Sequence, residues 1–136
     1  LKDLQLSENQ LTGAIPETVG QCVELEKVLL NENQLTGAIP ETIGRCVKVK
    51  VLSLHQNQLS GAIPEAIGQC VELEHLILHA NQLSGKVPHA ALAKLTKIKQ
   101  LALDGNAALT ITEAGKQLIV EAVNKEAKFW WPSVVG

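Results

Sequence analysis

Apolar residues recur along the chain with a period of 24 positions. In register, the units cover residues 1–24, 25–48, 49–72 and 73–97, and a last unit begins at Ile98. Four columns of positions are apolar throughout: Leu1, Leu25, Val49, Leu73 and Ile98; Leu4, Val28, Leu52, Leu76 and Leu101; Leu6, Leu30, Leu54, Leu78 and Leu103; Leu11, Leu35, Leu59, Leu83 and, one place out of step, Leu109. A fixed period of this length indicates a repeat array.

The second and third columns are two residues apart, which is the spacing of side chains on one face of a strand. One such strand cannot bury its apolar face alone, but stacked units can align identical columns into continuous ladders. The stretch ENQLTGAIPET occurs at 8–18 and again at 32–42, with variants at 56–66 and 80–90. Each unit is therefore predicted to be one coil of a stacked solenoid.

Two further columns are polar or conformationally special. The first is a column of asparagines, which we interpret as structural because an Asn amide can both donate to and accept from inward-pointing backbone groups. Its members are Asn9, Asn33, Asn57, Asn81 and Asn106. The second column consists of Gly13, Gly37, Gly61 and Gly85, which we expect to supply a tight turn or a close backbone approach.

The pattern LxxLxLxxNxLxGxIPxxIGxC resembles the plant-type leucine-rich repeat found in plant receptor ectodomains and polygalacturonase-inhibiting proteins. The resemblance covers residues 1 to about 109. It implies an α/β solenoid, a right-handed superhelix with a parallel sheet on the concave side and turns or short helices on the convex side. It also implies a non-enzymatic module that binds a protein, peptide or glycan partner. The main alternative is a structural or adhesive repeat protein, with the solenoid as a scaffold or flat-surface binder.

The pattern breaks after Asn106, and residues 110–136 are predicted to form a C-terminal helical cap on a repeat domain of residues 1–109. Either Thr110, through a capping-box spacing with Glu113, or Thr112 is the expected N-cap. The apolar residues expected on one side of this helix are Leu118, Ile119, Ala122, Val123, Ala127 and Trp130.

At the other end Leu1 already occupies a repeat position, so the first coil is expected to be uncapped, with Leu1, Leu4 and Leu6 exposed at its edge. That edge predicts either missing upstream repeats or self-association.

Composition narrows the partner class. The net charge is −2 with acidic and basic residues interspersed, so no basic surface for nucleic acid is visible, and no apolar run is long enough to span a membrane. No cofactor motif or catalytic set is recognisable.

The three cysteines, Cys22, Cys46 and Cys70, are expected to be buried and reduced. The lack of paired cysteines and of glycosylation sequons favours an intracellular setting, whereas the plant-type resemblance allows an extracellular one.

Candidate binding residues are the strand positions that alternate with the buried columns, because they differ from coil to coil while the scaffold does not. We predict partner contacts on the concave face at Leu29, Asn31, Ser53, His55, His75, Ile77, His79 and Asp104. A second interpretation of His55, His79 and Asp104, three successive members of one row, is a divalent-metal site. The flat-surface alternative needs a regular ladder of threonines or similar residues. The candidate column does not keep its threonine, because Thr12 and Thr36 are followed at the same repeat position by Ser60 and Ser84.

Overall fold

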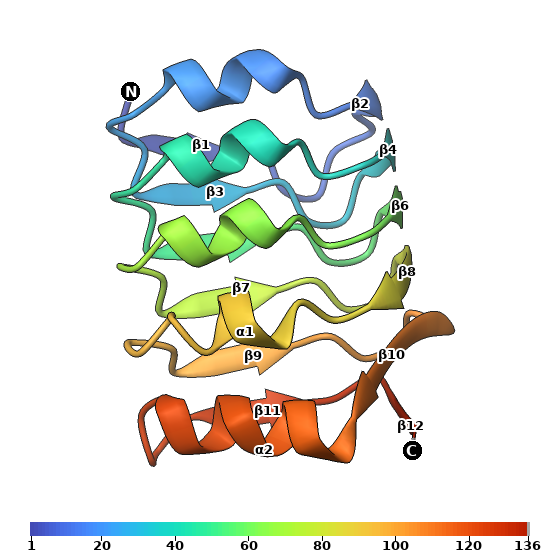
Figure 1. The fold of residues 1–136 in the computed structure, drawn as a ribbon. Helices are drawn as coiled ribbons and strands as arrows, with labels where there is room; N and C mark the ends of the chain where they lie inside the picture. The colour runs from blue at the N-terminus through green and yellow to red at the C-terminus, as the bar shows by residue number, and fades with distance from the viewer. Residues whose placement is uncertain (136) are drawn as a thin grey trace.

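The computed structural model describes residues 1–135 and consists of stacked coils that run between two parallel sheets (Figure 1). The first sheet has the strand order β1 (Asp3–Gln5), β3 (Lys27–Leu29), β5 (Val51–Ser53), β7 (His75–Ile77), β9 (Gln100–Ala102) and β11 (Lys128–Trp130). The second has β2 (Thr12–Ala14), β4 (Gln34–Gly37), β6 (Gln58–Gly61), β8 (Gln82–Lys86), β10 (Ala108–Thr112) and β12 (Ser133–Val135). The predicted α/β solenoid is confirmed, and the first sheet is its concave sheet.

Short helices form the convex side, where each coil returns from the second sheet to the first. They are the 3-10 helices η1 (Glu17–Gln21), η2 (Glu41–Arg45) and η3 (Glu65–Gln69), followed by α1 (His89–Leu92) and α2 (Glu113–Ala122). None of the helices in residues 1–135 combines the length and apolarity that a membrane span requires.

The apolar columns form one continuous core between the two sheets and the helices. Leu25, Leu73 and Leu83 are completely buried, and the same holds for most of their counterparts in the other coils. The first coil is different, because Leu1, Leu6 and Leu11 are 74%, 41% and 37% exposed. Cys46 and Cys70 are buried and free, whereas Cys22 is only half buried; the expectation of three buried thiols is therefore wrong for the first coil.

The buried asparagines join neighbouring coils by hydrogen bonds. The Nδ2 of Asn57 donates to the carbonyl oxygens of Leu30, in the preceding coil, and Leu54, in its own. Its Oδ1 accepts from the N–H of Leu35, 3.0 Å away. Asn33, Asn81 and Asn106 repeat the arrangement, while Asn9 is exposed and bonds only within the first coil. Backbone groups that the irregular turns leave unpaired are thereby satisfied inside the core.

Two glycine columns set how closely the coils pack. Gly13, Gly37, Gly61 and Gly85 have φ between 76° and 81°, a region that favours glycine. The second column, Gly20, Gly44 and Gly68, lies in the 3-10 helices and faces the next coil. A Cβ added at Gly44 would lie 2.6 Å from the carbonyl oxygen of Ala66, so the approach of η2 to η3 requires glycine.

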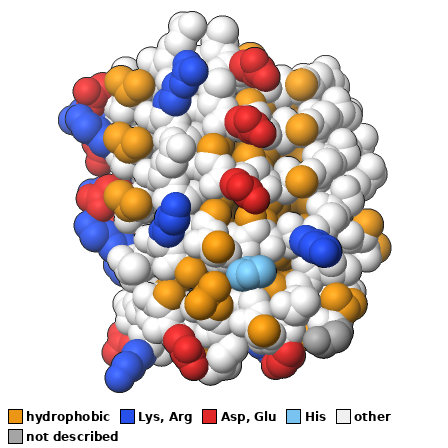
Figure 2. All heavy atoms as spheres, viewed as in Figure 1, with side chains coloured by type: hydrophobic (Ala, Val, Ile, Leu, Met, Phe, Trp, Pro, Cys, Tyr) orange, Lys and Arg blue, Asp and Glu red, His pale blue; other side chains and the backbone are white. Residues whose placement is uncertain are grey.

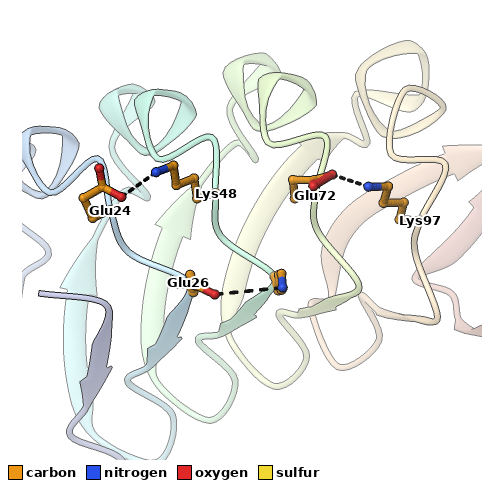
Figure 3. A network of polar contacts seen from close by, with 6 residues as sticks. Glu24, Glu26, Lys48, Glu72 and Lys97 are labelled. Carbon is orange, nitrogen blue, oxygen red and sulfur yellow. Dashed lines mark hydrogen bonds and ion pairs between the residues drawn. The ribbon is translucent and has the colours of Figure 1, made fainter.

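Charged side chains alternate in sign along the edge where the chain enters the first sheet (Figure 3). We call this edge the charge ladder; its two rows are Glu24, Lys48, Glu72 and Lys97, and Lys2, Glu26, Lys50, Glu74 and Lys99. Ion pairs join Glu24 to Lys48, Glu72 to Lys97, Glu26 to Lys50 and Glu74 to Lys99, the last at 2.9 Å. Exposed pairs of this kind stabilise little individually, but they favour one stacking register of the coils.

The C-terminal segment departs from the predicted single helix. Thr112 is the N-cap of α2, its Oγ1 accepting from the N–H of Gly115 at 3.0 Å, but the helix ends at Ala122. The prediction that Trp130 lies on this helix is wrong, since residues 128–130 form strand β11 beside β9. Leu118, also expected on the apolar side, is 44% exposed, while Ile119 and Val123 are buried. The domain boundary at residue 109 stays a prediction.

Candidate recognition surface

The outer face of the concave sheet carries side chains in ordered rows, because its strands pair in register. The central row is Gln5, Leu29, Ser53, Ile77, Ala102 and Trp130. A second row is Asp3, Lys27, Val51, His75, Gln100 and Lys128. A third row lies just beyond the strand ends and consists of Ser7, Asn31, His55, His79 and Asp104. From Asn31 onward, the backbone carbonyl group of each member accepts a hydrogen bond from a backbone N–H of the preceding coil.

A hollow of about 410 Å³ opens on this face over β7, β9 and β11. It is lined by His55, Ile77, His79, Gln100, Ala102, Asp104 and Trp130. The hollow has a simple origin, because Ala102, which like Ser53 is a small residue of the central row, lies between the larger Ile77 and Trp130. Ala102 is 5% exposed, whereas the Trp130 indole is 43% exposed. We name this feature the concave hollow.

Two imidazoles form one wall of the concave hollow. The rings of His55 and His79 stack with their centroids 4.6 Å apart and their planes inclined by 21°. The Nδ1 of His55 is buried and has no hydrogen-bond partner among the described residues. Burial, and to a lesser degree the neighbouring His79, lowers the pKa of His55 below its usual value of 6.5. The His55 imidazole is therefore uncharged at neutral pH.

The structure distributes the predicted site residues unevenly. His55, Ile77, His79 and Asp104 meet at the concave hollow, while Leu29, Asn31 and Ser53 lie on the strands towards the first coil. Ser53 is buried, and His75 lies in the second row with its Nδ1 2.9 Å from the Oε1 of Gln100. The metal interpretation finds no support in residues 1–135: the His55 and His79 rings stack, and no group of three His, Cys, Asp or Glu residues is arranged to hold an ion.

Trp130 was missed by the sequence analysis as part of this surface. It reaches the concave sheet because β11 pairs in parallel with β9 and continues the central row beyond the repeats. A signal was present in the alternation of Lys128, Phe129 and Trp130: in the structure Phe129 packs inward on the ring of Trp131, with centroids 4.8 Å apart, and its neighbours point outward.

Comparisons with known proteins agree with this architecture. Two family models, both described as leucine rich repeat, match residues 1–22 and 23–83. The BIR3–SERK2 complex from Arabidopsis thaliana is similar at 33% identity and a TM-score of 0.81, over 98% of this chain and 69% of that one. Comparison with curated proteins finds no match.

Two further solved structures are similar over smaller shares of their own length. The plant peptide hormone receptor RGFR1, in complex with RGF2, is 30% identical with a TM-score of 0.83, over 98% of this chain and 24% of that one. A plant ice-binding protein is 27% identical with a TM-score of 0.77, over 83% of this chain and 36% of that one. The present chain thus spans about a quarter of the receptor chain and about a third of the ice-binding chain.

Proposed function

The chain belongs to the leucine-rich-repeat family, and on that basis we propose that it is a non-enzymatic recognition module that binds a peptide segment of a protein partner along its concave sheet. The observation that carries the proposal is the concave hollow, which combines the apolar side chains of Ile77, Ala102 and Trp130 with polar side chains on an otherwise repetitive scaffold. The hollow arises where the rows vary from coil to coil, so it is specific to this position in the array.

The composition of the central row supports the same function. Leu29 and Ile77 are half buried on the outer face of the sheet, with polar side chains in the rows on either side. An apolar centre with a polar rim is typical of protein interfaces. The similarity to a peptide hormone receptor, itself in complex with RGF2, also favours a peptide ligand.

A selection from a random peptide library, displayed on phage, tests the proposal. We expect selected peptides to lose at least about tenfold in affinity for Ile77→Lys, because a buried unpaired charge is costly at an interface. Val71→Lys is the matched control, since Val71 is also apolar, is 49% exposed and lies outside the concave sheet. Selected peptides that bound Ile77→Lys as tightly as the unchanged protein would place the binding surface elsewhere.

A second candidate function, attachment to a flat repetitive surface such as ice, has one observation in its favour besides the similarity to an ice-binding protein. The outer face of the second sheet carries one hydroxyl residue at the same repeat position in each of three successive coils, Thr12, Thr36 and Ser60, although the strands are shifted so that Thr36 pairs with Ala14 and Gln58. Figure 2 shows no charged side chain on the margin over β2, β4 and β6. The regularity ends at β8, where Lys86 stands at the position of Ala14.

This second function predicts inhibition of ice recrystallisation that Thr36→Lys abolishes, because a charged side chain breaks the uncharged lattice. Thr18→Lys, at an exposed position on η1, is the matched control and keeps the activity. Equal inhibition by both variants, or none by the unchanged protein, would exclude the ice-binding function.

A further inference from the structure

We propose that the concave hollow is a subsite for an arginine side chain of the partner, with the Asp104 carboxylate as its counter-charge and the Trp130 indole as its stacking surface. The inference rests on the proposed function, because it assigns the chemistry of one part of the same concave surface.

The charge of the hollow is negative. Asp104 is the one acidic residue in its lining, and no Lys or Arg belongs to that lining. Among the described residues the Asp104 carboxylate makes no ion pair and accepts no hydrogen bond. Lys128 is paired with Gln100 in the second row, but only Gln100 belongs to the lining of the hollow. A cation is therefore the complementary ligand group.

The remaining fixed charges on this edge have the same sign. Glu8 and Glu32 directly follow the third row, next to Ser7 and Asn31, and both are exposed. These carboxylates add negative charge at the first-coil end of the edge, while the equivalent positions nearer to Asp104, Gln56 and Ala80, are uncharged. An anionic ligand group would be repelled by the same residues, and a purely apolar one would leave the Asp104 carboxylate desolvated without a partner.

The shape favours arginine over lysine. The small Ala102 forms the floor, Ile77 and Trp130 rise on either side, and the stacked rings of His55 and His79 close the third side. A guanidinium is planar, stacks on aromatic faces and binds a carboxylate with two parallel hydrogen bonds. The methylenes of an arginine stem would contact Ile77. An ammonium group would gain the charge interaction but neither the stacking nor the paired hydrogen bonds.

NMR titration with capped tripeptides tests the subsite without knowledge of the natural partner. The probes are acetyl-Gly-Arg-Gly-amide and the same peptide with citrulline, lysine or glutamate in the middle. Citrulline has nearly the shape of arginine but no charge. We expect the arginine probe to shift the Trp130 indole N–H and the ring signals of His55 and His79, with citrulline about three- to tenfold weaker and glutamate inert.

Substitutions then locate the charge. Asp104→Asn should remove the preference for arginine over citrulline, whereas Asp3→Asn, a matched change in the second row of the same sheet, should leave it intact. Ala102→Leu should block both probes by filling the floor of the hollow. Equal binding of arginine and citrulline, an unchanged preference in Asp104→Asn, or no binding of the arginine probe would overturn the subsite.

Failure of the subsite can be told apart from failure of the proposed function. Library-selected peptides that depend on Ile77 but contain no arginine, and that bind Asp104→Asn normally, overturn only the subsite. If no peptide of any composition binds the concave sheet, the recognition function itself is wrong.

Discussion

The imidazole of His55 lies face to face with that of His79 on the neighbouring coil, with 4.6 Å between the ring centroids. One charged ring would stand directly against the other, and His55 is also partly buried with its Nδ1 unpaired. Burial, with a smaller contribution from the neighbouring ring, therefore lowers the pKa of His55 and keeps its imidazole uncharged at neutral pH. Protonation of His55 at low pH would therefore place a positive charge in the wall of the concave hollow.

Acidification should destabilise the protein through His55. Its pKa is lower in the folded protein than its usual 6.5, so the unfolded chain binds the proton more readily. The free energy of unfolding therefore decreases as the pH falls below 6.5, and this loss is complete once the pH is below the lower pKa of His55 in the folded protein. Urea unfolding at about pH 7.5 and about pH 5 should show a larger loss for the unchanged protein than for His55→Gln. Equal losses would contradict the assignment.

Removal of the neighbouring ring should restore the His55 pKa only in part. Burial is the larger cause of the lowered value, and His79 is the smaller one. In His79→Gln, NMR titration of the His55 ring should give a pKa above that of the unchanged protein but still below 6.5. A complete return to 6.5 would mean that the charge of His79, and not burial, dominates.

Only one of the three thiols should react in the folded protein. Burial raises the pKa of Cys70 to about 12 and also raises that of Cys46, and their Sγ atoms lie 3.4 Å from the carbonyl oxygens of Ile43 and Val19. Cys22 is half buried in the first coil. A thiol reagent should therefore label one cysteine in the native protein and three after denaturation. In Cys22→Ser the native labelling should disappear; persistence of the reaction would show that an inner coil opens.

Asn57→Ala should destabilise the protein by about 1–3 kcal/mol, since the N–H of Leu35 and the carbonyl groups of two coils lose their partner in the core. Asn9→Ala is the control, because Asn9 is exposed and bonds only within its own coil. Its free energy of unfolding should change less. Equal effects on denaturant unfolding would show that the local turn, and not the link between coils, accounts for the asparagine column.

Gly44→Ala should destabilise more than Gly85→Ala, although only Gly85 has a positive φ, of 80°. An alanine at 85 meets no atom of residues 1–135 within 4 Å and bears only the conformational cost of about 1–2 kcal/mol. At Gly44 the new methyl group would collide with the backbone of Ala66 and push two coils apart. Thermal unfolding of both variants measures the difference, and a milder effect at Gly44 would show that η2 and η3 can separate without loss.

The repeated columns made the coil architecture predictable. Leucines such as Leu25 and Leu73 recur at a spacing that only stacked strands can bury, and the same spacing placed Ile77 and His79 on the open face. The left-handed residue that follows β1, β3, β5, β7 and β9 was not predicted, because glutamates such as Glu8 and Glu32 rarely adopt that conformation; only Gly105, after β9, is a residue typical of it.

The concave hollow could not be derived from periodicity. It depends on Ala102 standing in register with Trp130, and Trp130 lies outside the repeat. The apolar spacing of Val123, Ala127 and Trp130 suits a helix, but the side chain of Asn124 accepts from the N–H of Glu126 and turns the chain. The open edge of β9 then takes up β11. The pairing joins backbone groups of β9 and β11, which are far apart in the sequence, and a local pattern of apolar residues cannot predict such a pairing.

The charge ladder constrains how many coils an ancestral or engineered version of this chain can gain or lose. Because the sign alternates from coil to coil, deletion of residues 49–72 would bring Lys48 beside Lys97 and Glu26 beside Glu74. Deletion of residues 25–72, two whole coils, would instead restore opposite neighbours, Glu24 beside Lys97. Only insertions or deletions in steps of 48 residues, twice the visible repeat, thus keep opposite charges on neighbouring coils throughout the charge ladder.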